Sequence, residues 1–151
     1  MSNTSPSAAS STAMPAPAKP RKLFVNIPVS DLQRSIEFFT KLGFTFNPQF
    51  TDETATCMLV GEDAYFMLLT REKFEGFASK PVGDAHKETT SMFALSADSR
   101  QEVDALVKTA IEAGGRQAGQ PRDLGFMYNV SFYDLDGHEW EVFWMDPTAI
   151  Q

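Results

Sequence analysis

The chain has 151 residues, of which 42% are hydrophobic and 22% charged, and its formal net charge is -7 at pH 7. This length suffices for one domain with a sizeable core but not for two ordinary domains. The acidic balance argues against a nucleic-acid-binding or anionic-membrane surface, because both favour clusters of Lys and Arg. No apolar run approaches the roughly 20 residues that a membrane span requires. Cys57 is the only cysteine, so no intramolecular disulfide can form, which fits a cytoplasmic protein.

Residues 1–20 are rich in Ser, Ala, Thr and Pro and predict a disordered extension, without the apolar stretch of a secretory signal. Ordered structure is expected from residue 21. Apolar and polar side chains alternate over residues 23–29, which predicts a strand. Pro28 places this strand at a sheet edge or marks its last paired residue, because proline cannot donate a ladder hydrogen bond. A helix should follow, capped by Asp31 and ended by Gly43.

Three shorter strands are predicted at residues 44–46, 55–60 and 64–69. Residues 70–90 are polar and mixed, and they predict a connection that contains a short helix around residues 72–77. A connection of this length inside one domain is often functional, as a lid or as a contact for a partner.

The second half of the chain repeats the order of the first. A strand at residues 91–97 leads into a helix that Ser99 and Glu102 cap and that Gly114-Gly115 ends. Three strands should follow, at residues 116–118, 125–133 and 138–145. Each half is therefore predicted to be a β-α-β-β-β module.

The final strand poses the main functional question. After a turn at Asp136-Gly137, alternation places Glu141 on one face and Trp140 on the other. A carboxylate on a covered face must bind a ligand or metal, act as a general base, or pair with a polar neighbour such as Asn26, Arg122 or Tyr128. His138, directly after the turn, is expected to hydrogen-bond to the backbone rather than to act in catalysis.

Three segments together resemble the vicinal oxygen chelate superfamily, which includes glyoxalase I, bleomycin-resistance proteins and extradiol dioxygenases. Residues 29–39 resemble its strand-to-helix entry, residues 42–44 its helix end, and residues 132–141 its final turn and strand. The resemblance covers residues 21–146 and is strongest to the uncharacterised, glyoxalase-like branch.

The resemblance implies an α+β fold in one domain, residues 21–146, followed by a tail at residues 147–151. Two βαβββ modules, at about residues 21–70 and 91–146, would form an eight-stranded curved, incompletely closed sheet with the helices outside. Members of the superfamily commonly pair modules between chains, and open sheet edges give a physical reason for such pairing. The expected assembly is a homodimer.

The resemblance also implies where a divalent metal would bind. Enzymatic members hold it with one side chain from the first and one from the last strand of each module, here Phe24, Met67, Met92 and Glu141. Of these, only Glu141 offers a ligand for a hard or borderline ion, because thioethers suit soft ions. The usual four-ligand site is therefore expected to be lost, and no cofactor is expected. Rebuilding it from Asn26, His86 or His138 is the less favoured alternative.

Two functions are consistent with these residues. The first is binding of a small apolar or aromatic molecule in a cup formed by the curved sheet. The second is a metal-dependent lyase, isomerase or dioxygenase that uses Glu141 as a ligand or general base. The residues expected to contact the bound molecule are Phe24, Asn26, Met67, Met92, Tyr128 and Glu141.

Overall fold

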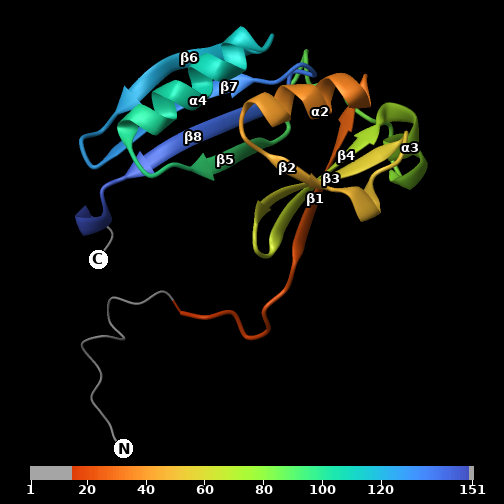
Figure 1. Cartoon of the computed structure of the whole chain (residues 1–151), viewed down its shortest axis with the longest axis horizontal. Coiled ribbons are helices and arrows are strands. Elements are labelled where there is room, and N and C mark those ends of the chain that lie inside the picture. The colour runs from red at the N-terminus through yellow and green to blue at the C-terminus, as the bar shows by residue number, and fades with distance from the viewer. Residues whose placement is uncertain (1–14, 150–151) are drawn as a thin grey trace, which may run out of the picture.

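A computed structural model describes residues 15–149. The first module contains β1 (Leu23–Val29), α2 (Leu32–Lys41), β2 (Thr45–Asn47), the 3₁₀ turn η1 (Pro48–Phe50), β3 (Ala55–Gly61) and β4 (Ala64–Thr70). The short helix α3 (Arg71–Phe77) and an irregular segment then lead to the second module, as Figure 1 shows. That module contains β5 (Met92–Ser96), α4 (Arg100–Glu112), β6 (Arg116–Asp123), β7 (Met127–Tyr133) and β8 (Glu139–Met145), followed by η2 (Pro147–Ala149).

The eight strands form two four-stranded mixed sheets, in the orders β1-β4-β3-β2 and β5-β8-β7-β6. The predicted succession of two βαβββ modules is thereby confirmed. Each sheet has one parallel pair, β1 with β4 or β5 with β8, and the other neighbours are antiparallel. Among the described residues no strand ladder joins the two sheets, so the assembly stays open and side chains hold its halves together.

The internal repeat extends to the strand register. In the first module Phe24 pairs with Tyr65 and Asn26 with Met67. In the second, Met92 pairs with Glu139 and Ala94 with Glu141. The alignment of the two halves of the sequence therefore agrees with the strand pairing at each of these positions. Phe24 and Met92 occupy equivalent positions, as do Met67 and Glu141.

The strand and helix ends follow the local signals. β1 is an edge strand, as Pro28 predicts. Asp31 accepts a hydrogen bond from the Arg34 N–H at the start of α2, and Ser99 accepts one from Glu102 at the start of α4. Both helices end before a glycine with positive φ, Gly43 at 102° and Gly114 at 113°, a conformation that side chains with a Cβ disfavour.

One predicted strand ends elsewhere in the structure. β6 extends to Asp123 rather than ending at residue 118, and its pairing with β7 is irregular between Ala118 and Arg122. Gly119, with φ 76°, and Pro121 lie in this irregular part and conceal the strand in the sequence. The predicted disorder of residues 1–20 lies mostly outside the described residues, which begin at residue 15. No helix among residues 15–149 is long and apolar enough to cross a membrane.

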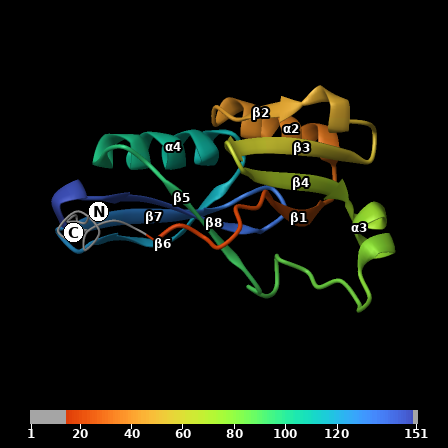
Figure 2. The ribbon, with the colours of Figure 1, turned by 90° about the horizontal axis from the view of Figure 1, so that it is seen from below.

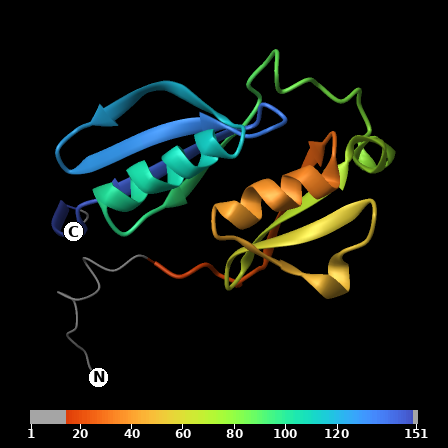
Figure 3. The same cartoon turned by 45° about the horizontal axis from the view of Figure 1, so that its top comes forward.

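The helices α2 and α4 lie on the same side of the two sheets, whereas α3 and the segment that follows it run along the other side (Figures 2 and 3). The main core lies between the sheets and α2 and α4. Trp140 and Val142 of β8 point into it and are buried, so Glu141 lies on the opposite face. The aromatic centre of this core consists of Phe38, Phe39, Phe66, Phe93, Phe132 and Trp140.

Gly115 marks the closest contact between α4, β7 and the first module. A Cβ at this position would lie 2.6 Å from the Tyr133 carbonyl oxygen and 3.0 Å from that of Ala110. We expect Gly115→Ala to lower the free energy of unfolding by about 2 kcal/mol, because rigid backbone would have to move. Denaturant unfolding followed by circular dichroism measures the change.

The matched control is Gly76→Ala in α3, where a Cβ meets no atom within 4 Å. This variant should equal or exceed the wild type in stability by up to about 1 kcal/mol, since alanine is the better helix former. Equal destabilisation of both variants would contradict the packing described for Gly115.

Candidate functional site

The side of the sheets away from α2 and α4 forms what we call the cup face. Strand alternation assigns it Phe24 and Asn26 from β1 and Met67 from β4, because Ile27, Val29 and Leu68 are buried on the helix side. The second module contributes Met92 from β5 and Glu141 from β8 by the same argument. Five of the six residues predicted to contact a ligand therefore share this face.

Two equivalent rows of residues cross the cup face. In the first module the row runs Asn26, Met67, Cys57 along paired strands. In the second it runs Ala94, Glu141, Ser131. Burial raises the pKa of the Cys57 thiol, and this side chain is 1% exposed, as expected for a small hydrophobe.

The four positions implied as metal ligands are open to different degrees. Phe24 is 42% exposed and Met92 68% exposed, and both are among the largest exposed apolar side chains of the described chain. The Phe24 ring stacks on Tyr65 with centroids 4.7 Å apart. Glu141 is partly exposed and has no ion-pair partner among residues 15–149. Its carboxylate therefore remains available to a ligand or to water.

Tyr128 does not join this set. It pairs in register with Trp144 and Asp123, on the helix side of β7, and its hydroxyl donates a 2.6 Å hydrogen bond to Asp104 of α4. Asn26 was also considered as a polar partner of Glu141, but its side-chain amide donates to the Phe24 carbonyl oxygen. The structure places Tyr128 in a polar cluster that fixes the β6–β7 turn to α4.

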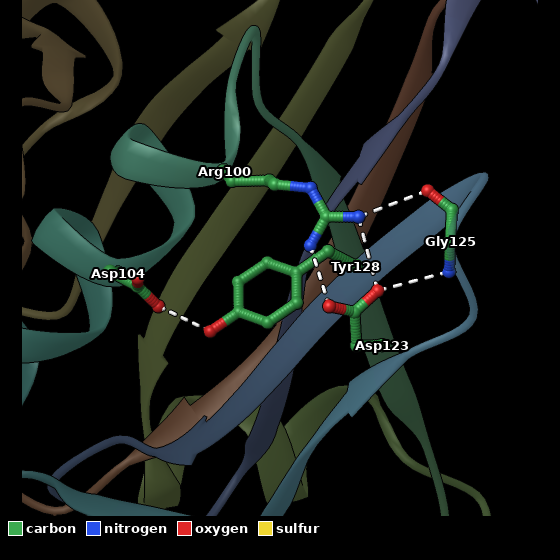
Figure 4. Close-up of polar contacts among 5 residues, drawn as sticks. All are labelled: Arg100, Asp104, Asp123, Gly125 and Tyr128. Carbon is green, nitrogen blue, oxygen red and sulfur yellow. Dashed lines mark hydrogen bonds and ion pairs between the residues drawn. The ribbon is translucent and has the colours of Figure 1, made fainter.

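Figure 4 shows this cluster, in which Arg100 is the centre. Its guanidinium donates to both carboxylate oxygens of Asp123, at 2.8 and 3.0 Å, and to the Gly125 carbonyl oxygen at 2.9 Å. The same guanidinium lies over the rings of Tyr128 and Trp144, 5.2 and 5.1 Å from their centroids. Every charged group in this cluster has a hydrogen-bond partner, so we assign the cluster a structural role.

The cup face of the first module contains a cavity of about 520 Å³, which we call the cup cavity. Asn26, Leu69, Phe74, Phe77 and Ala78 line it. α3 provides Phe74 and Phe77 as one wall, and they are three residues apart on the same side of the helix. Sequence reasoning predicted the helix but assigned it no ligand contact, although the spacing of its two Phe residues was visible.

A second group of cavities lies where the segment after α3 crosses the end of β1. The largest, about 390 Å³, is lined by Pro28, His138 and residues of the segment from Ala78 to Thr90. His138 Nε2 lies 2.7 Å from the Pro28 carbonyl oxygen, which confirms the predicted hydrogen bond to the backbone. Asp136 Oδ1 accepts a 2.8 Å hydrogen bond from the Ser30 N–H. The turn before β8 thus joins the two modules.

Asp134 shapes this turn from within. Burial raises the pKa of its carboxyl group, while the nearby His138 and donated hydrogen bonds oppose that shift. Its Oδ1 accepts from the N–H groups of Asp136 and His138, and its Oδ2 accepts from Trp140 Nε1 at 2.9 Å. These three donors compensate for removing a carboxylate from water.

The donor chemistry of the four implied metal positions does not fit a divalent ion. Phe24 has no ligand atom, and Met67 and Met92 offer only thioethers, so Glu141 alone could bind Zn²⁺, Ni²⁺, Fe²⁺ or Mg²⁺. Among residues 15–149 no three side chains of His, Cys, Asp or Glu are grouped so that they could hold an ion.

The fold belongs to a recognised class. Residues 21–61 match the family described as bleomycin resistance protein-like N-terminal. A hypothetical protein from S. aureus is 27% identical, with a TM-score of 0.71 over 83% of this chain and 95% of that chain. A glyoxalase/bleomycin resistance protein/dioxygenase family enzyme from Burkholderia phytofirmans PsJN is 18% identical, with a TM-score of 0.68 over 81% and 96% of the two chains.

The fosfomycin resistance protein FosX from Mesorhizobium loti is also similar, at 17% identity and a TM-score of 0.61 over 84% of this chain and 93% of that chain. A comparison with curated proteins gave no match. The paired-module fold is thus that of the glyoxalase, bleomycin resistance and dioxygenase proteins. The family match covers residues 21–61 of the first module, and the fold of the whole described chain is similar to that of these proteins.

The pKa of Asp123 tests whether the polar cluster around Arg100 forms in solution. Hydrogen bonds from Arg100 and from the Gly125 N–H lower the pKa of Asp123 to about 2. A carboxyl group whose pKa is lowered on folding stabilises the fold above its unfolded pKa of about 3.9, and that contribution is lost as the pH falls toward 2. We expect the Asp123 carboxyl resonance to titrate near 2 by NMR.

In Arg100→Gln the Asp123 titration should move upward toward about 3.9. The control Arg34→Gln removes an exposed cation from α2 and should leave it unchanged. An Asp123 midpoint near 3.9 in the wild type would show that the ion pair with Arg100 does not form in solution.

Proposed function

We propose that this protein binds a small apolar or aromatic molecule in the cup cavity, without the four-ligand metal site of its enzymatic relatives. The observation that carries the proposal is the replacement of ligand side chains by Phe24, Met67 and Met92 on the cup face. Aromatic and thioether side chains offer polarizable contact surface to a flat or hydrophobic molecule.

The cup cavity has the dimensions and composition of such a site. Its volume of about 520 Å³ lies within the range of small-molecule pockets, which are mostly apolar with a few polar groups. Four of its lining residues, Leu69, Phe74, Phe77 and Ala78, are apolar, and only Asn26 is polar. Asn26 and Met67 are direct neighbours across β1 and β4, so the cavity adjoins the implied ligand positions.

The alternative is a metal-dependent lyase, isomerase or dioxygenase that uses Glu141 as a ligand or general base. The observation in its favour is the Glu141 carboxylate, which lies on the cup face without an ion-pair partner among the described residues. Glu141 lines none of the five described cavities, and neither do Phe24, Met67 and Met92.

We further propose that residues 21–146 act as one domain in a cytoplasmic homodimer. The edge strands β2 and β6 leave backbone groups unpaired by any described strand, which gives a physical reason for association. Light scattering at working concentration should give twice the mass of one chain, and a strictly monomeric mass would contradict this arrangement.

Filling the cup cavity tests the proposed binding. Ala78 follows α3 with an extended, exposed backbone and lines this cavity, so Ala78→Trp should fold while its indole occupies the space. We expect the neutral fluorescent probe N-phenyl-1-naphthylamine to bind the wild type and to bind Ala78→Trp at least about tenfold more weakly, because the tryptophan displaces buried apolar contact. Fluorescence titration measures both.

The matched control is Ser79→Trp. Ser79 lines the 390 Å³ cavity but not the cup cavity, whereas Ala78 lines both. Equal loss of affinity in both variants would place the binding elsewhere. Probe binding should also persist in chelator, and near-stoichiometric Fe, Ni, Zn or Mn that is lost in Glu141→Ala would support the metal-dependent alternative instead.

A further inference from the structure

The charge around the cup cavity restricts what it can hold. Neither an acidic nor a basic side chain is among its lining residues, although α3, which forms one wall, carries four charged residues. An ion that enters such a cavity without a partner loses its hydration and gains nothing in return. The positions of the charges on α3 therefore decide which ligands are admitted.

Neither of the two cations of α3 lines the cup cavity. The Arg71 guanidinium donates to the carbonyl oxygens of Val82 and Gly83, at 2.9 and 3.3 Å, and its Nε lies 3.4 Å from the Glu75 carboxylate. The pKa of Asp52 is lowered chiefly by hydrogen bonds from Thr54, with a smaller contribution from the positive charge of Lys73. Lys73 is not among the residues that line the cup cavity. Neither cation is directed at a ligand in the cup cavity.

The single polar side chain of the cavity has a defined orientation. Asn26 Nδ2 donates a long, 3.4 Å hydrogen bond to the Phe24 carbonyl oxygen. A carbonyl oxygen can only accept, so the amide must turn its Nδ2 side toward Phe24. Oδ1 accepts no hydrogen bond from any residue of the described chain. The cavity therefore presents an unused acceptor beside an otherwise apolar lining.

We propose that the ligand of the cup cavity is an uncharged aromatic molecule that donates one hydrogen bond, from a hydroxyl or N–H group, to Asn26 Oδ1. This assignment rests on the proposed binding function and adds the charge and the polar group of the ligand. Anionic molecules meet no free cation there, and cationic molecules meet no carboxylate. Asn26 is exposed, so an aromatic molecule without a donor would displace water from Oδ1 without replacing its hydrogen bond, which costs affinity.

A series of three naphthalenes tests the assignment at pH 7 on the full chain. The probes are 2-naphthol, which is neutral and donates; 2-methoxynaphthalene, which is neutral and cannot donate; and 2-naphthoate, which is an anion. Isothermal titration calorimetry should show 2-naphthol binding about three- to tenfold more tightly than 2-methoxynaphthalene, the usual range for one hydrogen bond. 2-Naphthoate should bind more weakly than both.

The variant Asn26→Ala removes the acceptor and copies the residue that the second module has at the equivalent position, Ala94. In this variant 2-naphthol should lose its advantage, while 2-methoxynaphthalene should bind within about twofold of its wild-type affinity, since its apolar contacts remain. The three wild-type affinities test the assignment even if the variant fails to fold.

The outcomes separate the two proposals. Equal binding of 2-naphthol and 2-methoxynaphthalene to the wild type, or tightest binding of 2-naphthoate, would overturn the assignment of a neutral donor. In that case loss of binding in Ala78→Trp but not in Ser79→Trp would still support the cup cavity as the site. Failure of all three probes to bind would overturn the proposed function, and this inference with it.

Discussion

The fold depends on the packing of Trp140 between the two modules. Its indole lies against Phe39 and Phe66 of the first module, with centroids 5.2 and 4.7 Å away, and against Phe93 of the second, 5.1 Å away. Because no strand ladder connects the two sheets in the described chain, this aromatic contact takes over the role that backbone pairing has inside each sheet. A buried tryptophan also needs a partner for its N–H, and Asp134 supplies the acceptor. The same carboxylate then holds the turn before β8, so packing and turn geometry are set together.

The inward direction of the Trp140 side chain determines which face of β8 each following residue occupies. With Trp140 and Val142 in the core, strand alternation turns Glu141 to the cup face. The turn also reaches the first module through His138 and Asp136, which bond to backbone groups at the end of β1. The residues most suggestive of catalysis in the sequence are therefore divided between two tasks: the turn residues join the modules, and only Glu141 faces the open side.

Local patterns in the sequence predicted most of the fold because they have local causes. Alternation over residues 139–145 and the caps at Asp31 and Ser99 each depend on neighbours within a few positions. The site was harder to predict. Tyr128 was assigned to the ligand by its chemistry, yet its partner Asp104 lies on a helix 24 residues away and holds it on the other side of β7. Phe74 and Phe77 lie in a helix of 7 residues, which is too short for its periodicity to show which face they cover. Contacts between distant segments decided both cases.

The two modules differ in the segment that continues the chain after their last strands. After β4 the chain enters α3, whose Phe74 and Phe77 line an open cavity together with Asn26 of the first row. After β8 the described chain has only the short turn η2, and the equivalent row with Ala94 and Glu141 lines none of the described cavities. Apolar side chains beside a cavity can remove the apolar surface of a ligand from water, whereas a carboxylate on an open face stays hydrated at little cost. Met67 and Glu141, at equivalent positions, are both partly exposed, so they differ not in exposure but in the Phe side chains that lie beside the first row.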